Sequence, residues 1–253
     1  MNRTPISDLK AKAKDQLLGN YGIATGSFAL LFVLIYAIAM LISSATAIGT
    51  AKNGYIGYFG PGLWGQILSQ VFGMVIATLT MVFSVGYIGI MLKISKGERA
   101  VISDLFFAFR NHPDKVIIVS LIMTGIQFIL LLPATIVSGK TSGSGESDFF
   151  DGKRFLLWVV LYIAGIAVSY VVDLMLSMSF LIYLEEPEKN VSEIISESVT
   201  MMKGNKFRYF YMTLSFLGYW LLALLSLGIA FLWVAPYQSM AMVEFYKDLR
   251  GDI

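Results

Sequence analysis

This chain has 253 residues, of which 57% are hydrophobic and 14% are charged, and its formal net charge is +2. A soluble domain of this length could not hide so much apolar side chain in one core, so the composition predicts a polytopic membrane protein. The small net charge argues against a nucleic-acid partner. With no cysteine and a single histidine, His112, the chain has no disulfide, no thiolate nucleophile and no Cys-ligated or multi-His metal site.

The first apolar run, Ile23 to Ile42, precedes the small residues Ala45-Thr46-Ala47, which resemble a signal-peptide cleavage site. The run is about twice as long as most signal-peptide cores. We therefore expect a retained membrane helix.

Apolar runs long enough to cross a bilayer, about 20 residues, recur along the whole chain. The last run, Phe207 to Tyr246, would be roughly 60 Å long as one helix, twice the hydrocarbon thickness, so it must fold back. A tight turn is expected at Ser226-Leu227-Gly228. The pattern predicts an all-α bundle with six spans, arranged as three hairpins: Ile23 to Ile48, Gly65 to Ile94, Val116 to Val137, Phe155 to Leu184, Phe207 to Leu225 and Ile229 to Tyr246.

The basic residues fall mostly on one side of this arrangement. Four of the 19 Lys and Arg residues, namely Lys52, Lys140, Lys153 and Arg154, lie on one side, and the other fifteen lie on the opposite side. Since basic loops stay in the cytoplasm, we expect both termini to be cytoplasmic.

An amphipathic segment precedes each odd-numbered span, which predicts approximate repeats over 7–100, 103–190 and 192–250 within one transmembrane domain, 1–253. Each segment begins with a serine that is a candidate N-cap: Ser7, Ser103 and Ser192. Glycine follows twelve residues after the first and third serines, at Gly19 and Gly204, whereas the second copy has Lys115 there.

The apolar faces of these segments are candidate interfacial surfaces. They comprise Ile102, Leu105, Phe106 and Phe109 in the second segment and Ile194 and Ile195 in the third. Such a face can lie in the headgroup layer, or it can pack beneath the bundle as ordinary structure. The sequence leaves both alternatives open.

One acid, Asp173, lies inside an apolar run, where an ionisable group is a functional candidate. Polar residues at helical spacing accompany it: Gly165, Ser169 and Ser177 on the same helix, and Ser120, Thr124 and Gln127 on the preceding one. These stripes could hydrogen-bond to each other or line a wet cavity. A structural acid, paired with an inner lysine or arginine, is the alternative.

The segments Met201-Met202-Lys203-Gly204-Asn205-Lys206 and Phe245-Tyr246-Lys247-Asp248-Leu249, with Leu18-Gly19-Asn20, Lys96-Gly97-Glu98 and Asp104-Leu105-Phe106, give the chain a family resemblance. It resembles bacterial integral membrane proteins known only as domain of unknown function 975. It is also distantly similar to the membrane region attached to some glycerophosphodiester phosphodiesterases, although no residue of their catalytic barrel is present. The resemblance implies a bacterial cytoplasmic membrane and no activity.

No catalytic set of residues, metal cluster or cofactor motif can be assembled from this sequence, so we expect a non-enzymatic protein without cofactors. The first hypothesis is a membrane protein that engages the lipid bilayer or other membrane proteins through its interfacial helices. The second is a small transporter or channel with a polar path through Asp173, Gln127 and Ser169, and a third is immunity to, or export of, a membrane-active peptide.

Overall fold

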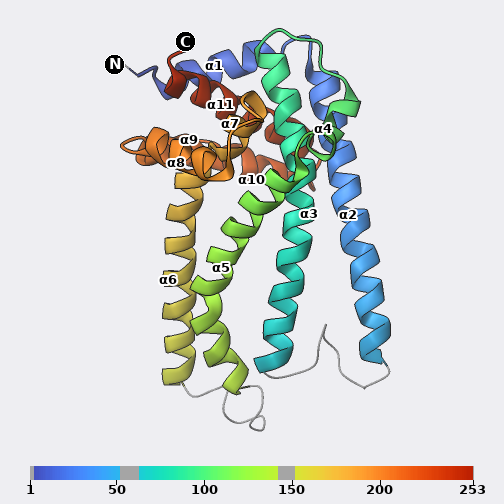
Figure 1. Ribbon diagram of the computed structural model, residues 1–253, viewed down its shortest axis with the longest axis vertical. Helices are drawn as coiled ribbons and strands as arrows, with labels where there is room; N and C mark the ends of the chain where they lie inside the picture. Colours follow the sequence, from blue (N-terminus) through green and yellow to red (C-terminus); the bar gives the residue numbers. More distant parts are fainter. Residues whose placement is uncertain (1–2, 52–62, 142–151, 253) are drawn as a thin grey trace. The chain divides into compact units, whose positions relative to one another are not determined.

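The computed structural model describes residues 3–51, 63–141 and 152–252, which form helices joined by turns, with no strand among them (Figure 1). The helices are α1 Ile6–Leu17, α2 Tyr21–Ala51, α3 Leu63–Ser95, the 3₁₀ helix η1 Ile102–Phe106, α4 Phe107–Arg110, α5 Pro113–Thr141, α6 Gly152–Leu176, α7 Ser179–Glu185, α8 Val191–Met202, α9 Lys206–Leu214, α10 Leu217–Leu225 and α11 Phe231–Arg250. The all-α prediction is confirmed for these residues.

Four helical stretches among the described residues are long and apolar enough to cross a membrane. They are Tyr21–Met40, Ile67–Ser95, Pro113–Ser138 and Gly152–Glu185. They coincide with the first four predicted spans. These helices are long because their apolar sequence is uninterrupted. In lipid, each backbone N–H and C=O group has to be hydrogen-bonded within the helix.

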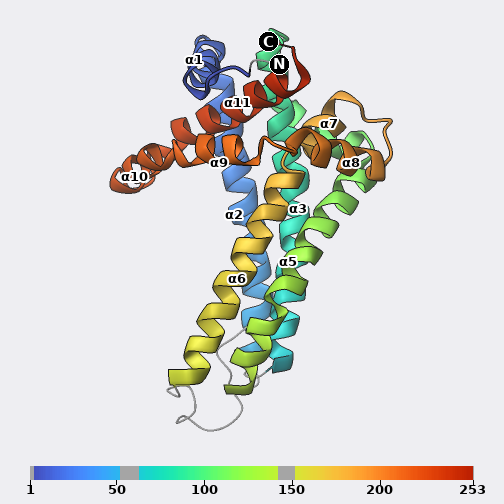
Figure 2. The same cartoon turned by 90° about the vertical axis from the view of Figure 1, so that its left-hand side faces the viewer.

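The fifth and sixth predicted spans form a helical hairpin, with α9 and α10 in the first limb and α11 in the second (Figure 2). The turn lies where the sequence predicted it, with Leu227 and Gly228 both at positive φ. Aromatic pairs link the two limbs along their length: Tyr209 with Phe245, Phe216 with Tyr237, and Trp220 with Phe231, at centroid distances of 5.2, 5.0 and 5.0 Å. That this hairpin crosses the membrane stays a prediction.

The first limb of the hairpin is interrupted between α9 and α10, at Ser215 and Phe216, which differs from the single helix expected there. Lys10 of α1 lies at this break. Its Nζ donates to the Ser215 hydroxyl at 3.2 Å and lies 4.4 Å from the centre of the Phe216 ring. A cation at the C-terminal end of α9 is favoured by the helix dipole. Burial lowers the pKa of Lys10.

The amphipathic segments begin one residue before the serines proposed as caps, so that part of the prediction is wrong. Helices α1, η1 and α8 have Pro5, Val101 and Asn190 at the N-cap. The carboxylate three residues later does the capping in two of them. Asp104 accepts from the Val101 N–H at 2.9 Å, and Glu193 accepts from the Asn190 N–H at 3.0 Å. An acid at this position satisfies a donor that the helix leaves unpaired.

The junctions after α1 and α8 have the same backbone geometry. Leu18 and Gly19 have φ of −60° and 84°, while Lys203 and Gly204 have φ of −64° and 81°. These values, with ψ of 124° for Leu18 and 118° for Lys203, describe a type II turn, which requires positive φ at its third residue. The middle segment instead has His112 at φ 47° before α5. The threefold repeat stays a prediction.

The chain forms two compact units, each built from separate stretches of sequence. Unit 1 contains Met1–Val33, Met81–Val119 and Leu174–Ile253, and unit 2 contains Leu34–Thr80 and Ser120–Asp173. Unit 1 therefore holds the three amphipathic segments and the hairpin. Unit 2 holds parts of the four membrane-length helices.

Candidate functional site

The acid predicted as an intramembrane candidate is hydrogen-bonded within unit 2. The Gln127 amide nitrogen on α5 donates to both carboxylate oxygens of Asp173 on α6, at 3.2 and 3.0 Å. No lysine or arginine among the described residues forms an ion pair with Asp173. The neutral amide therefore replaces the basic partner that the structural alternative had assumed.

The other predicted polar residues do not join this pair. Thr124 donates to the Ser120 carbonyl at 2.8 Å and Ser177 donates to the Leu174 carbonyl at 2.9 Å, so each bonds within its own helix. Ser169 is buried, and its hydroxyl has no hydrogen-bond partner among the described residues. Of the predicted set, the structure brings together Gln127 and Asp173 alone.

The stripe on α6 is the surface on which α5 packs. A Cβ at Gly165 would lie 2.9 Å from the Leu130 carbonyl oxygen, so the two backbones approach closely at this glycine. Asp173 lies two turns further along the same face. Small residues and polar pairs between membrane helices are typical of packing contacts, which favours a structural role for the stripe.

A second polar pair in unit 2 was missed by sequence reasoning. The Gln70 amide on α3 donates to the Thr135 hydroxyl on α5, and that hydroxyl donates to the Leu131 carbonyl at 3.1 Å. The available signal was an amide side chain in an apolar run. Like the pair of Gln127 and Asp173, this pair joins two helices. A specific polar contact fixes the register of the two helices, which apolar packing alone would not.

Two of the three amphipathic faces are covered by protein. In α1 the residues Leu9, Ala13 and Leu17 are fully buried, and α1 packs on α11 (Figure 1). In α8 the predicted interfacial residue Ile194 is also fully buried, while Ile195 is partly exposed. Helix α8 packs on α7, and the burial of Ile194 agrees with the alternative that this face packs against protein, so its interfacial role stays a prediction.

The middle segment, η1 with α4, differs because it exposes apolar side chains. Ile102, Phe106 and Phe109 are 48%, 37% and 43% exposed. The Phe83 ring of α3 lies 5.9 Å from that of Phe106 and 4.7 Å from that of Phe109, centre to centre. Val101 is 40% exposed. The name η1–α4 patch is used below for Val101, Ile102, Phe106 and Phe109 together with Phe83.

Leu105, also predicted as interfacial, anchors this segment from beneath. It is fully buried, and its carbonyl oxygen would lie 1.9 Å from a Cβ built on Gly86 of α3. Asp104 adds an ion pair with Lys93 of α3 at 2.8 Å. The 3₁₀ helix is thus held on α3 by one buried side and presents the patch on the other. The burial of Leu105 agrees with the packing alternative, and its interfacial role stays a prediction.

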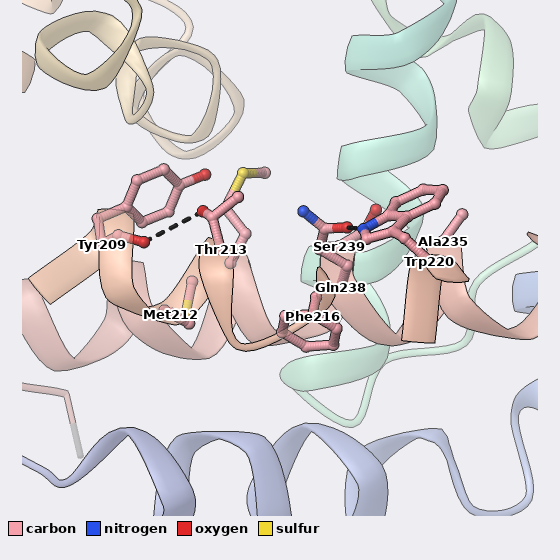
Figure 3. Close-up of a pocket in the computed structure, with 9 residues that line it drawn as sticks. Tyr209, Met212, Thr213, Phe216, Trp220, Ala235, Gln238 and Ser239 are labelled. Carbon is pink, nitrogen blue, oxygen red and sulfur yellow. Dashed lines mark hydrogen bonds between the residues drawn. The ribbon is translucent and has the colours of Figure 1, made fainter. Parts of the chain in front are cut away.

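A small cavity of about 200 Å³ lies between the limbs of the hairpin (Figure 3). The Trp220 indole N–H donates to the Gln238 side-chain oxygen at 2.8 Å, and since an indole can only donate, this bond fixes the orientation of the amide. Figure 3 shows the amide nitrogen turned away from Trp220. The cavity is smaller than most small-molecule sites, which span roughly 300–1,000 Å³.

Charged groups connect the ends of three helices in unit 1, namely α3, α7 and α11. Glu185 at the end of α7 accepts from Lys96 at 2.7 Å, from Arg250 at 2.6 Å and from the Tyr246 hydroxyl at 2.9 Å. Among the described residues, no group of three or more His, Asp or Glu side chains is placed to hold a metal ion. The network joins α7 to the ends of α3 and α11 by ion pairs.

A second such link joins the start of the chain to its end. Asp248 accepts from the Thr4 backbone N–H at 3.0 Å and from Arg208 at 2.7 Å. Burial raises the pKa of the Asp248 carboxyl, but the hydrogen bonds from Thr4 and Arg208 outweigh it and hold that pKa below its usual range.

Over the described residues, these features define a helical protein with four apolar helices of membrane-spanning length, parts of which share unit 1 with the shorter helices. The chain belongs to a family of proteins of unknown function, DUF975, whose sequence pattern matches residues 1–252. Neither the curated proteins nor the solved structures contain a match to it. The similarity to the membrane region of glycerophosphodiester phosphodiesterases stays a prediction.

Proposed function

We propose that this protein is a non-enzymatic integral membrane protein of the bacterial cytoplasmic membrane, with both termini in the cytoplasm, and that it engages lipid through the η1–α4 patch. The observation that carries the proposal is the exposure of Ile102, Phe106 and Phe109 on a segment whose other side is anchored to α3. In water, a contiguous exposed apolar patch is unusual unless it binds something. Lipid is the partner with the matching chemistry.

The charges around the patch agree with a place in the headgroup layer. Arg99 precedes the segment and Arg110 ends it, and both are exposed. Basic side chains beside an apolar face are the pattern of an interfacial helix on an anionic leaflet, where each basic residue near the surface contributes about 1 kcal/mol.

The hairpin of α9, α10 and α11 supplies the remaining two crossings of the proposed six-span arrangement. Leu221, Leu224 and Leu225 on α10 are 54%, 68% and 80% exposed. The predicted spans, Phe207 to Leu225 and Ile229 to Tyr246, would each be about 28 Å long as helices, which is close to the hydrocarbon thickness. Lipid around α10 would remove these leucines from water.

The depth of the η1–α4 patch tests the lipid proposal. The chain has no cysteine, so Phe106→Cys and, as a control, Glu188→Cys each introduce a single attachment point for a nitroxide. Glu188 has a side chain that is 89% exposed. In nanodiscs, the label at position 106 should collide with lipid-soluble oxygen more often than with a water-soluble nickel chelate, and the label at position 188 should do the opposite. Chelate-dominated collisions at both positions would contradict the proposal.

A second candidate function, transport along the α5–α6 seam, is favoured by the bond between Gln127 and Asp173. A carboxylate at membrane depth is a common feature of ion pathways. If this function holds, Asp173→Asn should abolish a flux that the purified protein supports in proteoliposomes. Unchanged flux, with a lowered thermal midpoint, would assign Asp173 to helix packing instead.

A further inference from the structure

A second cavity, of about 230 Å³, lies beside the η1–α4 patch within unit 1. It is bounded by the end of α3, by η1 with α4, and by the end of α7. Its lining combines charged with apolar side chains: Gly89, Leu92, Lys93, Lys96, Glu98, Asp104, Phe107, Leu184 and Glu185. Phe107 lies between Phe106 and Phe109 in the sequence, so one short segment carries both the patch and a wall of the cavity.

The end of α3 sets the positions of the charged groups. Gly97 has φ 72°, and its N–H donates to the Ile94 carbonyl at 3.0 Å, while the Glu98 N–H donates to the Lys93 carbonyl at 2.9 Å. These two bonds are a Schellman motif, which reverses the chain after a helix. The turn therefore brings Glu98 back over the last turn of α3, beside Lys93 and Lys96.

The two lysines keep donors available for a ligand. Lys93 pairs with Asp104 at 2.8 Å and Lys96 pairs with Glu185 at 2.7 Å, but their side chains remain 34% and 39% exposed. An ammonium group has three N–H donors, and one pairing leaves two. Glu185 is also neutralised by Arg250 at 2.6 Å, so Lys96 can bind an anion without leaving a carboxylate unpaired.

Glu98 supplies the opposite charge. It is exposed, and its carboxylate has no partner among the residues that the structure describes. The cavity thus presents ammonium donors and a free carboxylate within one small volume. A simple anion would meet the carboxylates of Glu98 and Asp104, and a simple cation would meet the lysines, whereas a zwitterion matches both.

We propose that this cavity binds the headgroup of a phospholipid that carries a phosphate and a primary amine, of the phosphatidylethanolamine type. Lys93 and Lys96 donate to the phosphate, and Glu98 accepts hydrogen bonds from the ammonium. A quaternary ammonium cannot donate such bonds, so a choline headgroup binds less well. Phe107, Leu92 and Leu184 provide apolar contact for the start of the acyl chains. The inference rests on the proposed lipid function and names the lipid.

Binding of short-chain lipids to the purified full-length protein tests the proposal. Dioctanoyl phosphatidylethanolamine should raise the thermal midpoint at lower concentrations than the choline or glycerol analogues. Glu98→Gln should weaken binding of the ethanolamine lipid about tenfold and abolish its advantage over the choline lipid, because one charge-assisted hydrogen bond is lost. Lys96→Gln should weaken the ethanolamine and choline lipids alike.

A variant outside the cavity, Glu188→Gln, removes an exposed charge and should leave binding unchanged. Equal binding of the ethanolamine and choline lipids, or a Glu98→Gln variant that keeps the preference, would overturn the proposal. Free phosphoethanolamine binding as tightly as the lipid would also overturn it, in favour of a soluble ligand. A failure here, with the label at position 106 still in lipid, would leave the proposed function standing.

Discussion

Replacing Gly86 by alanine should dislodge the η1–α4 segment from α3. A Cβ at this position would lie 1.9 Å from the Leu105 carbonyl oxygen and 2.5 Å from the Leu105 carbonyl carbon. Both atoms are backbone, so no side-chain rotation relieves the overlap. The segment has to move by more than 1 Å, or the helix has to bend.

The size of the effect follows from two opposing contributions. Overpacking costs about 1–3 kcal/mol and more where backbone must shift, while alanine in place of glycine favours a helix by about 1 kcal/mol. If the overpacking cost lies near the upper end of its range, the free energy of unfolding falls by roughly 2 kcal/mol in total. For a protein of this size that corresponds to a fall in thermal midpoint of roughly 4–8 °C.

Two other glycines on α3 provide matched controls. A Cβ at Gly89 would meet a movable side-chain atom, Leu184 Cδ2, at 3.3 Å, and one at Gly73 would meet nothing within 4 Å. Thermal midpoints measured by fluorescence-detected size exclusion should rank Gly73→Ala highest, Gly89→Ala next and Gly86→Ala lowest. If Gly86→Ala has the same thermal midpoint as Gly73→Ala, the described contact between α3 and η1 is wrong.

Three further outcomes are expected. Gln127→Leu should lower the thermal midpoint by the equivalent of about 1 kcal/mol because the Asp173 carboxylate loses its donor, and Asp173→Asn, which keeps an acceptor, should lower it less; equal losses would contradict the pairing. The folded-state pKa of Asp248 lies below its unfolded value, so the stabilisation from its carboxylate is complete above about pH 4 and is lost as the pH falls through the folded pKa. Asp248→Asn should therefore reduce the fall in thermal midpoint that the protein shows on acidification. An unchanged fall at acid pH would refute this. A thiol at Leu227→Cys should react with an impermeant maleimide from outside intact cells if the hairpin crosses the membrane, and only after permeabilisation if it does not.

Charge placement by itself does not decide between four and six spans. The turn at Ser226-Leu227-Gly228 carries no Lys or Arg, so adding or removing the last hairpin moves no basic residue across the membrane. Both arrangements put the termini on the same side. The sequence thus predicts an orientation, while the number of crossings depends on whether α9, α10 and α11 lie in the bilayer.

The sequence by itself determined the helical class, the four long apolar helices and the turn of the last hairpin, because apolar run length and turn-forming residues act locally. It also placed Gln127 and Asp173 on facing stripes, since helical spacing is a local property. Only the tertiary structure decided which amphipathic face is covered: Ile194 is buried and Phe106 is exposed, although both lie on apolar faces. Burial depends on which helix packs against a face, and the spacing of apolar residues within that face does not say whether another helix covers it.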